Sequence, residues 1–132
     1  MSEKSKGIVI IVCGGRAYDD SDAAFDALDR FHAAKPVSLV VQGGAPGADL
    51  LAKTWARSRG VPCQEERADW NKHGRKAGPI RNQHMLKTWR PQAVVAFPGG
   101  AGTAHMKRIA KEAGVPVFTP RLPATPVQTS VG

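Results

Sequence analysis

Several features are scarce in this chain, and each scarcity excludes a class of protein. The apolar run from Ile8 to Cys13 is far too short to span a bilayer. The first residues lack the long apolar region of a secretory signal. We therefore expect a cytoplasmic protein that does not enter a membrane.

Cysteine is rare, and histidine lacks the spacing of a metal site. Cys13 and Cys63 each lie in a strand-like context, which is typical of reduced structural thiols. The four histidines do not have the spacing of a zinc site, so we expect no metal, and no motif indicates a resident cofactor. A Gly-x-Ser-x-Gly elbow is also missing, which argues against a serine hydrolase.

Acidic residues are fewer than basic residues in this chain. The chain of 132 residues has 19 Lys and Arg against 11 Asp and Glu, a formal net charge of +8. This charge favours anionic partners, whether nucleic acid, an anionic membrane or free nucleotides. A basic, solvated face without a partner explains the charge equally well, so composition alone does not choose among these alternatives.

Apolar runs alternate with helical patterns along the chain. Strands are predicted over 7–13, 37–42, 62–67, 92–97 and 115–118. Helices are predicted over 20–34, 47–58, 79–89 and from about 102 to 113, with an irregular basic segment over 68–78. Residues 7–119 are expected to form one domain, preceded by a flexible start over 1–6 and followed by a disordered Pro-, Thr- and Ser-rich tail over 120–132.

This alternation predicts a Rossmann-like α/β fold. Repeated strand–helix–strand units with right-handed crossovers form a parallel sheet with helices on both faces. We therefore expect a three-layer α/β/α domain with a mostly parallel five-stranded sheet. In such sheets, ligands bind at the carboxyl ends of the strands, where every glycine-rich segment of this chain is expected to lie.

The first glycine-rich segment follows the strand predicted over 37–42. Gly43, Gly44 and Gly47 precede a helical pattern, which is the arrangement of an anion site at a helix N-terminus. The segment is neither a Walker A loop nor the spaced-glycine dinucleotide fingerprint. The glycines alternatively make only a tight turn. Asp49 either caps the helix or contacts a ribose hydroxyl.

The second glycine-rich segment is the sharper signal for phosphate. Glycines free the backbone for close approach, and a threonine places a hydroxyl donor in the first turn of the helix. The predicted phosphate contacts of this segment are Pro98, Gly99, Gly100, Gly102 and Thr103.

Further candidate contacts lie elsewhere in the chain. Gly14 and Gly15 precede Arg16, whose planar guanidinium suits a bidentate contact with phosphate, although a surface arginine is the alternative. In the basic segment, Trp70 is predicted either to stack on a base or to anchor the loop in the core. Lys72, Arg75 and Arg81 are further candidates for neutralising phosphate, although a solvated face is the preferred interpretation of Lys72.

These motifs together resemble one family. The pattern comprises Gly14-Gly15-Arg16-x-Tyr18, the Gly43-to-Asp49 segment, Ala68-Asp69-Trp70-x-x-His73-Gly74, Ala77-Gly78-x-x-Arg81-Asn82-x-x-Met85 and the segment from Ala96 to Thr103. Their order is similar to that of the YspA-type, YpsA-related branch of the SLOG superfamily, which includes the SMF/DprA proteins and the Lonely Guy phosphoribohydrolases. The resemblance implies a Rossmann-like fold and a nucleotide or nucleotide-derived ligand.

The resemblance also raises the question of catalysis. The Lonely Guy enzymes release the base from nucleoside monophosphates, and their Pro-Gly-Gly-x-Gly-Thr motif matches Pro98 to Thr103. Their basic helix resembles Arg81-Asn82, but His105 stands where they carry the catalytic glutamate. Histidine is a poorer partner for a cationic transition state. The candidate catalytic residues therefore stay open among Asp49, Asp69 and His105, with Glu66 as a further possibility.

Three functions follow in order of preference. The first is a sensor or sequestering module that binds a nucleoside phosphate or an ADP-ribose-like molecule. The second is a nucleotide N-glycosidase of the Lonely Guy type. The third is nucleic-acid binding, which the charge and the resemblance to SMF/DprA proteins suggest. Related folds often dimerise through helices, so we also expect a homodimer.

Overall fold

The structure is a computed structural model, and it describes residues 7–121. The predicted flexible start and residues 122–132 of the predicted tail lie outside the described residues. Along the chain the elements are β1 (Ile8–Cys13), α1 (Ser21–Ala34), β2 (Val37–Gln42), α2 (Ala48–Arg59), β3 (Cys63–Glu65), α3 (Trp70–His73), the 3-10 turn η2 (Gly74–Lys76), α4 (Ala77–Trp89), β4 (Ala93–Ala96), α5 (Ala101–Glu112) and β5 (Val117–Phe118).

The five strands form one sheet in the order β3-β2-β1-β4-β5. Each pair of neighbours is parallel, so the sheet is parallel throughout the described residues rather than only mostly so. In the register, Cys13 lies opposite Ala96, so β1 and β4 end at the same level. The chain runs outward from β1 to β3 on one side and from β4 to β5 on the other. The strand order therefore switches between β1 and β4, where open α/β sheets bind ligands.

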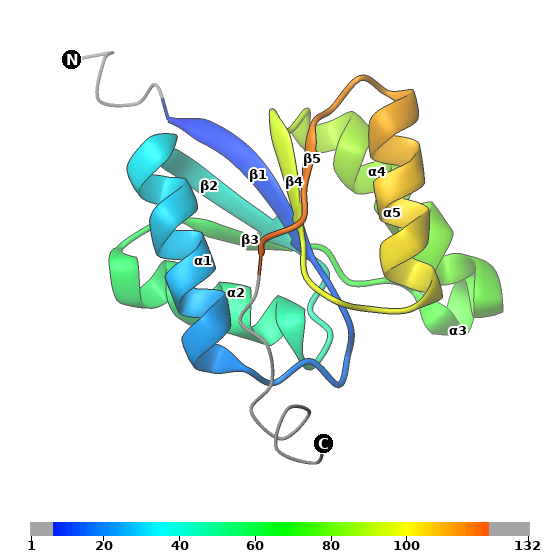
Figure 1. The fold of residues 1–132 in the computed structure, drawn as a ribbon. Coiled ribbons are helices and arrows are strands. Elements are labelled where there is room, and N and C mark those ends of the chain that lie inside the picture. The colour runs from blue at the N-terminus through cyan, green and yellow to red at the C-terminus, as the bar shows by residue number, and fades with distance from the viewer. Residues whose placement is uncertain (1–6, 122–132) are drawn as a thin grey trace, which may run out of the picture.

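Helices cover both faces of the sheet, which confirms the predicted three-layer architecture (Figure 1). Ile10 and Val12 of β1 point to one face and pack in a cluster with α1 and α2, which includes the fully buried Trp55. Ile11 points to the other face and packs against α4 and α5, where Met106 is buried. This alternation along β1 is the period of two that a strand imposes on its side chains.

The two helices predicted on the first half of the chain are present, and their bounds differ from the predicted ones by at most one residue. Asp20 is the N-cap of α1, and its carboxylate accepts a hydrogen bond from the Ala23 N–H at 3.0 Å. Gly60 ends α2 with a φ of 71° and a ψ of 24°, the left-handed conformation that glycine adopts without strain.

The prediction of an irregular segment over 68–78 is wrong, because most of this segment is helical. The Asp69 carboxylate accepts the Lys72 N–H at 3.1 Å and starts α3, which continues through η2 into α4. Helix α4 begins at Ala77, two residues before the predicted start. Pro79 is therefore the third residue of the helix, where its missing N–H would have had no helical partner in any case. The third strand is also shorter than predicted, since β3 covers only three residues.

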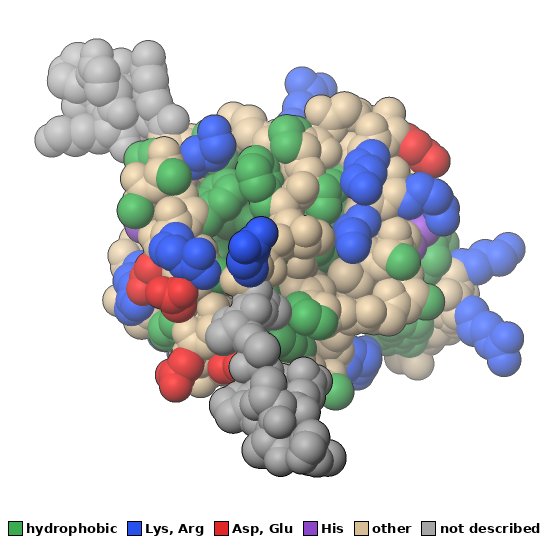
Figure 2. Space-filling view, viewed as in Figure 1, with side chains coloured by type: hydrophobic (Ala, Val, Ile, Leu, Met, Phe, Trp, Pro, Cys, Tyr) green, Lys and Arg blue, Asp and Glu red, His purple; other side chains and the backbone are tan. Residues whose placement is uncertain are grey.

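On the face seen in Figure 2, the Lys and Arg side chains are spread over several elements rather than gathered in one stripe. Within the part of the chain that the structure describes, no helix is both long and apolar enough to cross a membrane.

Candidate functional site

A cleft of about 930 Å³ opens at the carboxyl edge of the sheet. The loops after β1 and β4 form its floor, and α3, η2 and α4 supply one wall. Its position is the switch in strand order between β1 and β4. The cleft is therefore where the fold class predicts a ligand site.

Most of the predicted site residues come together in this cleft. Those lining it are Gly14, Gly15, Arg16, Gly43, Asp49, Trp70, Arg81, Asn82, Pro98, Gly99, Gly100, Gly102, Thr103 and His105. Three predicted residues, Gly44, Gly47 and Asp69, are not among the lining residues. Other lining residues include Cys13, Tyr18 and Met85, which the sequence did not mark as ligand contacts. Tyr18 and Met85 carried a signal, because each belongs to a motif of the family resemblance.

The loops after β1 and β4 are joined through their backbones. The Gly15 N–H donates to the Pro98 carbonyl at 2.7 Å. A Cβ on Gly99 would overlap the Thr103 hydroxyl and lie 2.6 Å from the Gly15 nitrogen. Part of the glycine content at this edge therefore serves close packing of one loop on another, which the sequence did not indicate.

Gly47 serves the same packing from the neighbouring loop. It has a φ of 80°, and a Cβ there would overlap the Gly15 carbonyl oxygen. The next residue, Ala48, donates its N–H to that same oxygen at 3.1 Å. Gly47 thus fits the first turn of α2 against the loop after β1 instead of facing the cleft.

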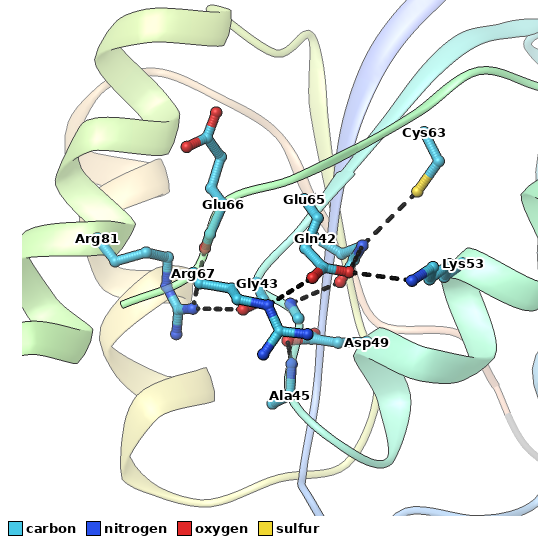
Figure 3. Close-up of polar contacts among 11 residues, drawn as sticks. Gln42, Gly43, Ala45, Asp49, Lys53, Cys63, Glu65, Glu66, Arg67 and Arg81 are labelled. Atoms are coloured by element: carbon cyan, nitrogen blue, oxygen red, sulfur yellow. Dashed lines mark hydrogen bonds and ion pairs between the residues drawn. The ribbon is translucent and has the colours of Figure 1, made fainter. Parts of the chain in front are cut away.

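Side chains from two strands hold the loop over 43–47 in place (Figure 3). The fully buried Gln42 accepts the Gly44 N–H at 2.6 Å and donates to Glu65 at 3.2 Å. Glu65 also contacts Lys53 at 3.4 Å and Arg67 at 2.6 Å, and the contacts with Gln42 and Arg67 lower its pKa. Gly44 therefore faces a polar network behind the cleft.

Asp49 lies in the first turn of α2 and is only 7% exposed. Its carboxylate accepts the Ala45 N–H at 3.1 Å and so holds the loop that precedes α2. The helix has no side-chain cap, so the expectation that Asp49 caps it is wrong. Burial raises the pKa of Asp49, while the Ala45 N–H and the positive charge of Arg81 oppose that rise. Asp49 also lines the cleft, so a contact with a ribose hydroxyl stays a prediction.

Arg81 reaches from α4 across to the neighbouring loop. One terminal nitrogen donates to the carbonyls of Gly43 at 3.0 Å and Glu66 at 3.3 Å (Figure 3). Burial lowers the pKa of Arg81. The guanidinium nevertheless keeps its charge, because the ordinary pKa of arginine is very high. Arg81 therefore brings a partly buried positive charge to the cleft in a fixed position.

The N-terminus of α5 presents open backbone to the cleft. The first helical bond runs from the Ala104 N–H to the Gly100 carbonyl, so the N–H groups of residues 101–103 have no acceptor within the helix. A Cβ added to Gly100 or Gly102 would meet nothing within 4 Å. Unlike Gly47 and Gly99, these two glycines leave space that a ligand can occupy.

Asn82 and His105 extend the polar surface beside this helix end. Asn82 is 5% exposed, and its amide nitrogen lies 3.1 Å from Nδ1 of His105. Burial lowers the pKa of His105, and the nearby Arg108 lowers it further, so the ring is neutral near pH 7.

The wall of the cleft combines an aromatic ring with a cation. Trp70 is 53% exposed, which argues against the alternative that it anchors the loop in the core. Its ring lies beside Gly78, where an added Cβ would be 3.5 Å away. Arg75 lines the cleft from the turn that follows Trp70.

The remaining reactive groups are a buried thiol and two carboxylates that lie outside the cleft. Burial, reinforced by the charge of Asp49, raises the pKa of Cys13 to about 12, so its thiol stays protonated and is a poor nucleophile. Asp69 caps α3 outside the cleft. The Glu66 carboxylate accepts a hydrogen bond from the Trp89 indole N–H at 2.9 Å and does not line the cleft. Within residues 7–121, no three His, Cys, Asp or Glu side chains gather as a metal site would require.

The fold and this cleft define a Rossmann-like domain with a cleft at the switch of strand order. The chain belongs to the YspA, cpYpsA-related SLOG family, whose model matches residues 8–73. It is 40% identical over 117 residues to the Gene 61 protein of Mycobacterium phage D29, a match that covers 83% of this chain and 93% of that relative. Membership in this family indicates a nucleotide-related function.

Proposed function

We propose that this protein binds a nucleotide or a nucleotide-derived molecule in the cleft and acts as a sensor or sequestering module. The observation that carries the proposal is the open N-terminus of α5 at the strand-order switch, next to the charge of Arg81. Free N–H groups and the helix dipole both favour a phosphate there.

The charges of the cleft support an anionic ligand. Arg16, Arg75 and Arg81 line it, and Asp49 is the one acidic side chain among the lining residues. Arg16 is exposed and follows the two glycines of the β1 loop, so it is free to turn toward a phosphate. Trp70 offers a ring on which a base can stack.

The volume supports a ligand of nucleotide size. Small-molecule sites usually occupy about 300–1,000 Å³, and this cleft lies near the upper end of that range. The space accommodates a base, a sugar and more than one phosphate, which fits a nucleoside phosphate or an ADP-ribose-like molecule.

His105 supports binding rather than cleavage. Its ring packs against the Asn82 amide, and an imidazole in either charge state brings no negative charge to an oxocarbenium-like ribose. Of the candidate catalytic carboxylates, Asp49 is the one that lines the cleft, because Asp69 lies outside it.

Isothermal titration of the full chain against nucleoside mono-, di- and triphosphates and ADP-ribose derivatives tests this proposal. We expect saturable binding of at least one compound, which Arg16→Ala weakens without changing the melting temperature. Chromatography of the ligand after long incubation should return it intact. A folded protein that binds no compound in the panel contradicts the proposal.

A nucleotide N-glycosidase is the second candidate, favoured by the Pro98-to-Thr103 match at the N-terminus of α5. In that case, incubation with nucleoside monophosphates releases free base, and Arg81→Ala abolishes the release. Asp49→Asn should abolish it as well, because Asp49 is the carboxylate of the cleft.

Nucleic-acid binding is the third candidate, favoured by Trp70 with Lys72, Arg75 and Lys76 on one continuous helical segment. Affinity for an oligonucleotide should then fall steeply with salt. Absence of a gel shift at low salt excludes this candidate. The homodimer also stays a prediction, which light scattering of the purified chain checks.

A further inference from the structure

Three polar side chains form a connected path from α4 to α5 at the rim of the cleft. Nε of Arg81 lies 3.0 Å from Oδ1 of Asn82, and Nδ2 of Asn82 lies 3.1 Å from Nδ1 of His105. Asn82 is buried, so its amide has few alternative partners.

The donors and acceptors along this path have one possible assignment. An arginine side chain can only donate, so the Asn82 atom that faces Nε must be the carbonyl oxygen. The amide nitrogen then faces His105, and the same nitrogen lies 3.4 Å from the Gly102 carbonyl, which can only accept. Two fixed partners therefore agree on the orientation of the amide.

The orientation of the amide determines the histidine tautomer. An NH2 group that faces Nδ1 requires a lone pair on Nδ1, and a neutral imidazole then carries its proton on Nε2. We propose that Asn82 is a positioning residue that holds His105 as a neutral Nε2–H donor, which binds an acceptor oxygen of the ligand in the cleft. The part that concerns the ligand rests on the proposed function, whereas the tautomer does not.

The charges around His105 are consistent with a neutral ring. Arg108 and Glu112 face it from its own helix, and Arg81 reaches it through Asn82 from α4. Arg16, Arg75 and Asp49 lie on the cleft side. Protonation of Nδ1 would place two N–H groups opposite each other, so the Asn82 contact is lost when His105 becomes charged in acidic solution.

Long-range nitrogen–proton NMR of the full chain without ligand tests the tautomer directly. We expect His105 to carry its proton on Nε2 near neutral pH. In Asn82→Asp, a carboxylate accepts from both Arg81 and His105, so the proton should appear on Nδ1 and the pKa of His105 should rise. The exposed His84 on the outer part of α4 is the internal control and should not change.

A His105 that carries its proton on Nδ1 in the wild type overturns the proposal. An unchanged tautomer and pKa in a folded Asn82→Asp variant also overturn it. Asn82→Ala provides a second variant if the carboxylate prevents folding, and it should leave His105 in a mixture of both tautomers.

Titration with AMP tests the contact with the ligand. His105→Gln retains an N–H donor and should bind AMP about fivefold more tightly than His105→Leu, since one hydrogen bond separates them. Equal affinities would overturn the ligand part of the proposal. If the wild type does not bind AMP at millimolar concentration, the ligand part of this proposal is wrong, and so is the choice of AMP as a ligand under the proposed function. The NMR experiment would still decide the tautomer, because it needs no ligand.

Discussion

The two glycine loops have similar compositions but different surroundings. The loop over 43–47 is held by Gln42 and Asp49, and Gly47 packs on the backbone of the β1 loop. The loop over 98–102 packs on the same neighbour through Gly99, but Gly100 has open space beside it. A glycine-rich sequence therefore predicts that another group lies close to the backbone, but it does not show whether that group belongs to the protein or to a ligand.

The difference assigns separate tasks to the two loops. The first loop fixes the start of α2 and the position of Arg81, whose guanidinium contacts the Gly43 carbonyl. The second loop leaves the N-terminus of α5 available to a ligand. Substitutions in the first loop should therefore change stability most, and substitutions in the second should change ligand affinity with little change in stability.

Gly47→Ala should have the largest effect on stability. The new Cβ overlaps the Gly15 carbonyl, and alanine does not tolerate the φ of 80° with a ψ of −129°. We expect the free energy of unfolding to fall by about 3 kcal/mol or more. Gly60→Ala is the matched control, because its φ is 71° but its Cβ meets nothing within 4 Å. It should cost about 1–2 kcal/mol in urea unfolding. Equal losses would show that the contact with the β1 loop is unimportant.

Gln42→Met should have the next largest effect. The substitution roughly conserves volume but leaves the Gly44 N–H without its partner. An unsatisfied buried donor costs about 1–3 kcal/mol, which urea unfolding can measure. Gln83→Met on the exposed side of α4 is the control and should stay within about 0.5 kcal/mol of the wild type. A stable Gln42→Met variant would mean that the loop needs no support from β2.

Asp49→Asn should change stability in a pH-dependent way. Because the folded pKa of Asp49 is raised, its ionised carboxylate disfavours the native state above that pKa. The variant should therefore be more stable than the wild type near pH 8. The gain should shrink as the pH falls toward 4, where the wild-type carboxyl becomes protonated. Thermal melts across this range measure the gain, and a gain that grows on acidification would contradict the direction of the pKa shift.

Gly102→Ala should have the smallest effect on stability and a clear effect on binding. The position is helical and open, so alanine should stabilise the fold by about 0.5–1 kcal/mol. The added methyl group lies where we place the ligand, so nucleotide affinity should fall about tenfold. A melting curve and a titration on the same sample measure both quantities. An unchanged affinity would remove the second loop from the site.

Local patterns in the sequence predicted most of the fold. Ile8 to Cys13 is a strand, Asp20 caps α1 and Gly60 ends α2, because each depends on residues close in sequence. The helical character of residues 70–76 was missed, since its short turns have too few residues to show a period.

The predicted site residues divide between those that line the cleft and those that pack behind it. Arg81 and Gly100 line the cleft as expected, but Gly44 and Gly47 do not. Gly44 faces Glu65 and Gly47 faces Gly15, contacts between segments that are separated along the chain. Local sequence patterns do not reveal which loop packs on which, so they cannot show which glycines stay open to a ligand.

Backbone amide NMR of the full chain, titrated with the tightest ligand of the nucleotide panel, tests the central claim most directly. The account predicts the largest shifts at the amides of residues 100–103 and of Gly15 and Arg16, and small shifts at Gly44 and Gly47. Large shifts confined to residues 44–47, or to amides remote from the cleft, would contradict it.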